Sequence, residues 1–224
     1  MIYEWYVVLL ISFGLGLMHA LDADHILAVS VLSADKSSLR KSLRYAFQWS
    51  AGHGLILLLV IIVVYSSGLA MPAFISDFAE QLVGAVLIAL GLLLIYRLQK
   101  YRLHIHFHVH DGLLPHAHWH QNEVNEHGAH QHEHKAYLIG SLHGMAGSAP
   151  LLAMIPLFKT DQLLLSVLYL CIFSLGVFIA MVCFGGVFGS LMQKMAKHSM
   201  RYATLIKVLL GIMSIGMGVH LVSG

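Results

Sequence analysis

The stretch WYVVLLISFGLGLMHALDADHILAVSVL, residues 5–32, is a long apolar run interrupted by the polar cluster HALDADH at residues 19–25. About 20 apolar residues suffice for a helix to cross a bilayer, so the run predicts a transmembrane helix. A charged carboxylate at the bilayer centre costs at least about 2.5 kcal/mol, so the two aspartates and two histidines need partners. We expect the cluster to be an ion or proton site. The alternative is a structural hydrogen-bond network, or a position near the cytoplasmic end where water reaches.

The rest of the chain has the composition of a polytopic membrane protein. Hydrophobic residues make up 58% of the 224 positions and charged residues 11%, whereas soluble domains carry roughly a quarter charged residues. Glu4 precedes the first run without any Lys or Arg, so we expect a retained helix rather than a cleaved signal. The predicted fold is all-α with six transmembrane segments, at residues 5–32, 45–65, 78–98, 136–158, 163–192 and 206–222.

Lysine and arginine alternate between the connections and predict the orientation in the membrane. The second connection has neither residue, and the fourth has only Lys159. The basic residues of the first, third and fifth connections are Lys36, Arg40, Lys41, Arg44, Arg97, Lys100, Arg102, Lys135, Lys194, Lys197 and Arg201. The positive-inside rule then places these three connections in the cytoplasm of a prokaryotic inner membrane and both termini outside.

The two halves of the chain resemble each other. When the chain is aligned with itself at an offset of 124 residues, residues 16–20 align with 140–144 and residues 50–52 with 174–176. At an offset of 127 residues, Gly84 and Gly91 align with Gly211 and Gly218. An odd number of spans gives the halves opposite topology, as in transporters with inverted repeats. We therefore expect two inverted three-helix repeats, 1–98 and 136–224, joined by a hydrophilic segment, 99–135.

On a straight helix the polar cluster divides into two groups. At about 100° per residue, His19, Asp22 and His25 fall at about 0°, 300° and 240° and share one face. Asp24 falls at about 140°, toward the other side. Asp24 is therefore expected either to hold a ligand in place without binding the ion itself or to lie on the path of the ion, unless the helix is irregular here.

Two more histidines lie in predicted spans, and the mixture of residue types favours a metal. His53 stands between Gly52 and Gly54, and His143 is the repeat mate of His19, followed by a predicted kink at 147–150. A lone buried histidine is often only a core residue, and His143 has gating or packing as its alternative role. Imidazole suits nickel, cobalt, copper and zinc, and carboxylates neutralise the charge. The predicted metal residues are His19, Asp22, Asp24, His25, His53 and His143.

The connection at 99–135 is rich in histidine. Eleven of the seventeen histidines lie there: His104, His106, His108, His110, His116, His118, His120, His127, His130, His132 and His134. Such tracts bind metals through a high local concentration of ligands. We expect a cytoplasmic segment that senses, buffers or captures metal before export or receives it after import. A solvated low-complexity linker is the alternative.

These motifs resemble those of a known family. Residues 19–25 match the H-x-x-x-x-D-H signature of the nickel/cobalt transporter family. Residues 52–54 are similar to its second-helix Gly-His motif, with Gly54 where Ser or Thr is usual, and residues 143–148 resemble the fourth helix of its six-helix, urease-accessory-type relatives. The resemblance implies a secondary nickel or cobalt permease of the lysine-exporter-like superfamily that needs the His and Asp residues of the first helix. The long His-rich segment is similar to that of efflux members, which favours export over import.

The expected function is therefore transport of a divalent transition metal, with proton exchange on His and Asp as the expected coupling, and without enzymatic activity. The chain has no G-x-x-x-x-G-K-[ST] loop for ATP hydrolysis, and we expect no obligatory cofactor. The expected partners are the Ni²⁺ or Co²⁺ ion, the lipid bilayer and a cytoplasmic metal chaperone, but no nucleic acid. A metal sensor or storage protein, an intramembrane metalloenzyme and an anion exporter are the alternatives.

Overall fold

The computed structural model describes residues 2–34, 38–67, 72–102, 107–108, 116–117, 129–146 and 163–223. Within these residues nearly all structure is helical. The elements are α1 (Ile2–His19), α2 (Ala23–Ala34), α3 (Leu39–Ser67), α4 (Ala73–Arg102), β1 (Phe107–His108), β2 (His116–Ala117), α5 (Ala129–Met145), α7 (Leu163–His198) and α8 (Met200–Ser223).

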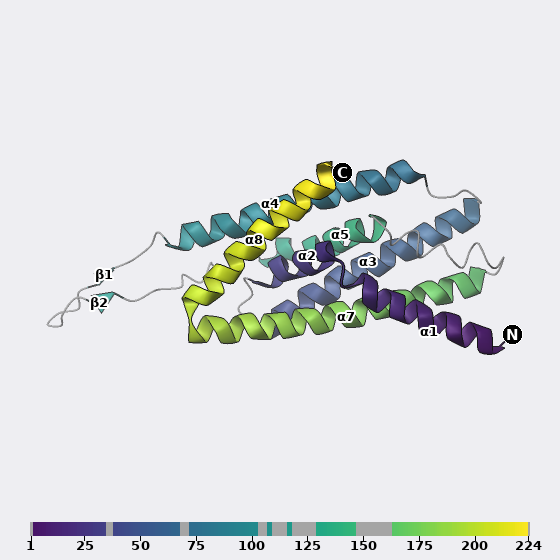
Figure 1. Cartoon of the computed structure of the whole chain (residues 1–224), viewed down its shortest axis with the longest axis horizontal. Helices are drawn as coiled ribbons and strands as arrows, with labels where there is room; N and C mark the ends of the chain where they lie inside the picture. The colour runs from purple at the N-terminus through teal and green to yellow at the C-terminus, as the bar shows by residue number, and fades with distance from the viewer. Residues whose placement is uncertain are drawn as a thin grey trace.

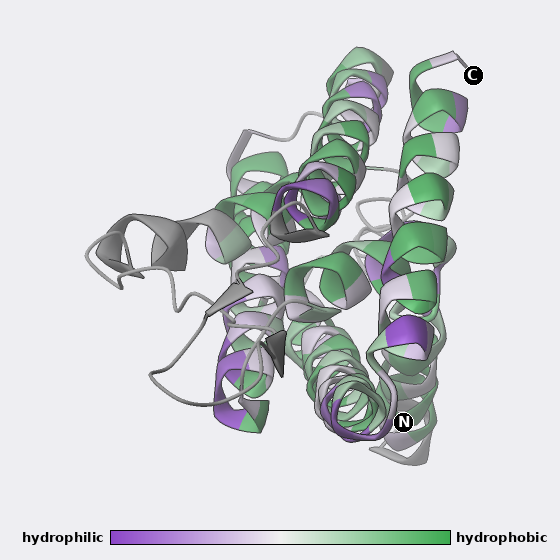
Figure 2. Ribbon diagram, turned by 90° about the vertical axis from the view of Figure 1, so that its left-hand side faces the viewer, coloured by the Kyte–Doolittle hydropathy of each residue, from purple (hydrophilic) through white to green (hydrophobic). Residues whose placement is uncertain are grey.

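Several of the helices are long and apolar enough to cross a membrane. Among the described residues, α3, α4, α7 and α8 meet this test, and α1 with α2 forms a fifth candidate if the bent pair is one span. Figure 2 shows hydrophobic residues along most of the length of the long helices. The predicted span at 136–158 is described only as far as 146, in α5. The chain is a helical polytopic membrane protein.

The first predicted span is broken, which is the irregular helix that the sequence analysis left open as an alternative. α1 ends at His19, α2 begins at Ala23, and the two helices are bent by 59°. Asp22 occupies the position before the first residue of α2, where Asp is a preferred cap, and its carbonyl accepts a hydrogen bond from the Ile26 N–H at 3.1 Å. Asp24 lies in the first turn of α2, where a negative charge stabilises the helix N-terminus. The same aspartates that suggest a site therefore also start a new helix.

The helices pack around the short helix α2. α4 packs on α8, α3 packs on α5 and α7, and α1 packs on α7. α2 contacts α3, α4, α7 and α8, and Figure 1 shows α2 and α5 between the α4–α8 pair and α7. The largest buried side chains of the core include Trp49, Leu57 and Phe173. The polar cluster at the α1–α2 break is thereby enclosed by other helices.

Glycines and serines hold the two halves of the chain together. Gly16 packs against the backbone carbonyl of Phe173, and Gly140 packs in the same way against Trp49. Gly140 lies 124 residues after Gly16, and Phe173 lies 124 residues after Trp49. The offset of the sequence repeat therefore relates the two contacts. Across the α4–α8 contact, Gly84 lies on Gly218 and Gly91 on Gly211. Small residues allow helix backbones to approach closely in a membrane.

Three serine hydroxyls donate hydrogen bonds to backbone carbonyls of other helices. They join Ser12 to Tyr169 at 2.7 Å, Ser141 to Gly52 at 3.2 Å and Ser214 to Leu87 at 2.7 Å. Such hydrogen bonds between helices add to close packing where lipid replaces water.

Parts of the His-rich segment are described, but only as backbone. β1 and β2 pair antiparallel, with Phe107 opposite Ala117 and His108 opposite His116. His130, His132 and His134 belong to α5. The remaining histidines of the segment, His104, His106, His110, His118, His120 and His127, lie outside the described residues.

Candidate metal centre

Four histidines from four helices meet in the interior. His19 ends α1, His25 lies in the first turn of α2, His53 lies in the middle of α3, and His143 lies near the end of α5. Their exposed fractions are 6%, 2%, 0% and 1%. Polar side chains this deeply buried need partners, because burial without a partner costs free energy.

The imidazole rings form one cluster around His25. Its ring centroid lies 4.6 Å from that of His19 and 5.4 Å from those of both His53 and His143. The Nε2 atoms of His25 and His53 are 3.5 Å apart. One donor atom each from His19, His25 and His53 lies within 4.8 Å of the other two.

The Nδ1 atoms of His25 and His143 have hydrogen-bond partners that leave their Nε2 atoms available, whereas neither ring nitrogen of His19 has such a partner among the described residues. His25 Nδ1 donates to Asp24 Oδ1 at 3.0 Å, and His143 Nδ1 donates to the Ile139 carbonyl at 2.8 Å. His19 Nδ1 lies 2.9 Å from Asp22 Oδ2. A histidine that donates through one ring nitrogen presents a lone pair on the other, which is how carboxylates and carbonyls orient metal-binding histidines. Nε2 of His19 has no hydrogen-bond partner among the described residues.

The two aspartates form a second, more open group of donors. Oxygens of Asp22 and Asp24 and a nitrogen of His25 also lie within 4.8 Å of one another. The Asp22 side chain is 49% exposed and the Asp24 side chain 18% exposed. The break after His19 invalidates the straight-helix angles, so Asp24 does not point away from the cluster. It contacts His25.

A pocket of about 290 Å³ adjoins both groups and adds a carboxylate that the sequence analysis missed. Its lining residues are His19, Asp22, Ala23, Asp24, His25, Glu80, Val83, Ala146, Met217 and Leu221. Glu80 lies near the start of the predicted third span, residues 78–98. A carboxylate within an apolar helix is itself a signal that would have found it.

Aromatic side chains wall the imidazole cluster. The Trp49 ring stacks on His53 with centroids 5.4 Å apart and also lies 5.4 Å from His143. The Phe173 ring lies 5.6 Å from His19. Trp49 and Phe173 are both fully buried. They keep the environment of the imidazoles apolar, which strengthens electrostatic interactions with any bound charge.

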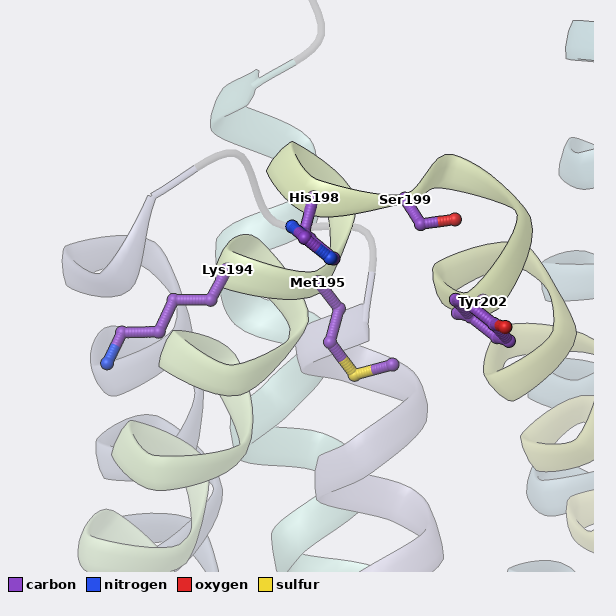
Figure 3. Close-up of a pocket in the computed structure, with 5 residues that line it drawn as sticks. All are labelled: Lys194, Met195, His198, Ser199 and Tyr202. Atoms are coloured by element: carbon purple, nitrogen blue, oxygen red, sulfur yellow. The ribbon is translucent and has the colours of Figure 1, made fainter.

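A second pocket, of about 220 Å³, lies at the α7–α8 turn and lacks such a donor set. It is lined by Lys194, Met195, His198, Ser199 and Tyr202. Figure 3 shows the Lys194 amine pointing away from Ser199 and Tyr202. His198 is the single imidazole in this lining, so the geometry does not favour a metal here.

Fold and site together define a class: a polytopic helical membrane protein with a buried centre of imidazoles and carboxylates at a broken helix. Residues 26–213 match the family model described as cytochrome C biogenesis protein transmembrane region, and the chain belongs to that family.

The chain is also similar to the urease accessory protein UreH of Bacillus sp. (strain TB-90). The two are 26% identical over 217 residues, which cover 95% of this chain and 89% of that protein. No solved structure matches the chain significantly.

Proposed function

We propose that the protein is a secondary transporter of divalent transition metal ions, nickel or cobalt. The observation that carries the proposal is the buried trio His19, His25 and His53, whose donor atoms lie within 4.8 Å of one another. Imidazole donors suit nickel, cobalt and zinc, whereas Mg²⁺ and Ca²⁺ prefer oxygen donors. Likeness to a urease accessory protein supports a role in nickel handling.

The spacing of the imidazoles fits a shared ion. Two nitrogens, each about 2.05 Å from a metal in tetrahedral geometry, are roughly 3.3 Å apart. The His25 and His53 Nε2 atoms are 3.5 Å apart. We propose that the site contracts around the ion, with His19 and His143 as further donors. Asp22 and Asp24 would orient the rings and neutralise the charge.

Transport is proposed to proceed by alternating access between two inverted three-helix repeats. The supporting observation is that the Gly16–Phe173 contact and the Gly140–Trp49 contact are related by the same offset of 124 residues. The Gly84–Gly218 contact is likewise related to the Gly91–Gly211 contact by an offset of 127. Inverted repeats of this kind hold a substrate site near the membrane centre.

The direction and coupling of transport are further parts of the proposal. With both termini outside, the His-rich segment lies on the cytoplasmic side of the inner membrane. There it would collect Ni²⁺ or Co²⁺, free or from a metal chaperone, before export, which we favour over import. Metal ligands must lose protons to bind, so proton exchange would couple the flux. A flux that ignores a pH gradient across proteoliposomes would contradict that coupling.

The transport proposal is tested by measuring flux of nickel, cobalt, zinc and iron into proteoliposomes. We expect nickel or cobalt to be carried, and expect His19→Ala and Asp22→Asn to lower the flux at least about tenfold, since each removes a donor or its partner. His198→Ala is the control, because this exposed histidine lies at the end of α7. If both variants equal wild type for every metal, the site is wrongly assigned.

A metal sensor or storage protein is distinguished from a transporter by the His-rich segment. The test variant has all eleven histidines replaced by Asn, three of them in α5, which begins at Ala129. A transporter keeps measurable flux in this variant, with a higher half-saturating metal concentration. Complete loss of function with an intact membrane centre would favour the sensor.

A further inference from the structure

The pocket beside the imidazole cluster is faced by carboxylates from separate parts of the chain. Asp22 lies at the α1–α2 break, Asp24 in the first turn of α2, and Glu80 in α4. His19 lines the same pocket, is 6% exposed, and has an Nε2 atom without a hydrogen-bond partner among the described residues. A buried nitrogen lone pair beside acidic side chains is a reason to look for a cation here.

Glu80 occupies an unusual place for a carboxylate. It is partly buried, next to Ala79 and one turn before Val83, whose exposed fractions are 3% and 0%. Residues 81–96 of α4, which follow Glu80, contain no Asp, Glu, Lys or Arg, and α4 is long and apolar enough to cross a membrane. Ionisable residues in such helices usually face a bundle interior or a water-filled cavity and mark an ion pathway.

The donors form two sets of different chemical character that share His25. The outer set is Asp22, Asp24 and His25, and the inner set is His19, His25 and His53. Carboxylates suit hard cations and hydrated ions, and imidazoles suit nickel, cobalt and zinc. The pocket volume of about 290 Å³ exceeds the roughly 180 Å³ that six water molecules take up in the liquid.

We propose that Glu80 and the two aspartates form a receiving station that holds a divalent cation with much of its water shell, from which His25 passes the ion to the inner imidazoles. This inference rests on the proposed transport function and adds a second binding position and a new residue to it. The outer station admits any divalent cation. The inner set of imidazoles selects transition metal ions, because Mg²⁺ loses its water reluctantly and prefers oxygen donors.

The station serves one side of the membrane. Glu80 lies near the beginning of α4 and Leu221 near the end of α8. Figure 1 shows the beginning of α4 toward the end of the molecule that is away from β1 and β2. The effects of changing Glu80 are therefore expected for metal on the side opposite the His-rich segment.

The test is nickel flux in proteoliposomes for wild type, Glu80→Gln, Glu80→Asp and the control Asp77→Asn. Asp77 lies one turn earlier on α4, is exposed, and does not line the pocket. We expect Glu80→Gln to raise the half-saturating Ni²⁺ concentration roughly five- to tenfold with little change in maximal flux. Excess Mg²⁺, which competes in wild type, should inhibit this variant less. Glu80→Asp should restore both properties in part, and Asp77→Asn should equal wild type.

Two results overturn the inference, and they are distinguishable from failure of the transport proposal. If Glu80→Gln has the same half-saturating Ni²⁺ concentration and the same Mg²⁺ inhibition as wild type, Glu80 is not part of the pathway. The transport proposal is unaffected by that result. If Glu80→Gln does not insert as a folded protein, Glu80→Ala takes its place, and wild-type values in that variant have the same meaning. A wild-type protein that carries no divalent metal refutes the transport proposal itself.

Discussion

At the scale of single residues, His25 is the centre of the site. Its Nδ1 donates to Asp24, its Nε2 faces that of His53, and its ring lies near those of His19 and His143. It belongs to both donor sets. A change at any neighbour of His25 should therefore alter metal affinity through the orientation of this ring.

Asp24 provides a test of that dependence. Asp24→Asn keeps an oxygen that can accept the His25 N–H but removes the charge, whereas Asp24→Ala removes both. If Asp24 orients His25 and holds the incoming ion only through its water shell, Asn should raise the half-saturating Ni²⁺ concentration about tenfold and Ala by up to about 100-fold. Flux in proteoliposomes measures this.

The opposite outcomes are equally clear for Asp24. Equal and complete loss of flux in both variants would make Asp24 a direct ligand of the ion. Wild-type half-saturation in both would remove Asp24 from the site.

At the scale of elements, the break between α1 and α2 creates the centre. It turns the chain by 59°, and donor atoms of His19 and Asp22 lie within 4.8 Å of a ring nitrogen of His25, which follows the turn. Broken helices are tolerated in a membrane where the freed backbone is buried in protein or lines a cavity. The residues of this break line the pocket, in agreement with that rule.

The packing of α1 on α7 gives a prediction about stability. A methyl group added at Gly16 would collide with the backbone of Phe173, whereas one at Gly14 meets nothing within 4 Å. We expect Gly16→Ala to lower the free energy of unfolding by about 1–3 kcal/mol, because backbone cannot move aside as a side chain can. Thermal denaturation in detergent would measure the loss.

Gly14→Ala is the matched control on the same helix. It should leave stability unchanged or raise it by up to about 1 kcal/mol, because Ala favours helix over Gly. Equal stability of the two variants would contradict the close approach of α1 and α7.

At the scale of the whole molecule, the orientation in the membrane is open to direct measurement. The connection before α4 and the His-rich segment after it should lie on opposite sides, since α4 can cross the membrane. In a variant with Cys171 and Cys183 replaced by Ala, Pro72→Cys should react with an impermeant maleimide in intact cells. Gly112→Cys should react only after permeabilisation. Labelling of both in intact cells would contradict the charge-based orientation.

The sequence by itself predicted a helical membrane protein and drew attention to six polar residues within its apolar runs. Apolar runs predict membrane helices wherever they occur, because each must satisfy its backbone hydrogen bonds internally. α3, α4, α7 and α8 cover the predicted spans at 45–65, 78–98, 163–192 and 206–222. Charged and imidazole side chains within such runs are conspicuous, so the six predicted residues of the centre could be named without coordinates.

Only the tertiary structure decided how these residues are arranged. Helical periodicity assumes a straight helix, so it placed Asp24 away from His19. In the structure α1 ends at His19, and Asp24 belongs to α2, where its carboxylate contacts the neighbouring His25. Glu80 joins the pocket only because α4 and α8 pack against the α1–α2 break. Contacts between residues distant in the chain depend on packing that no local pattern encodes, and the route through the site depends on those contacts.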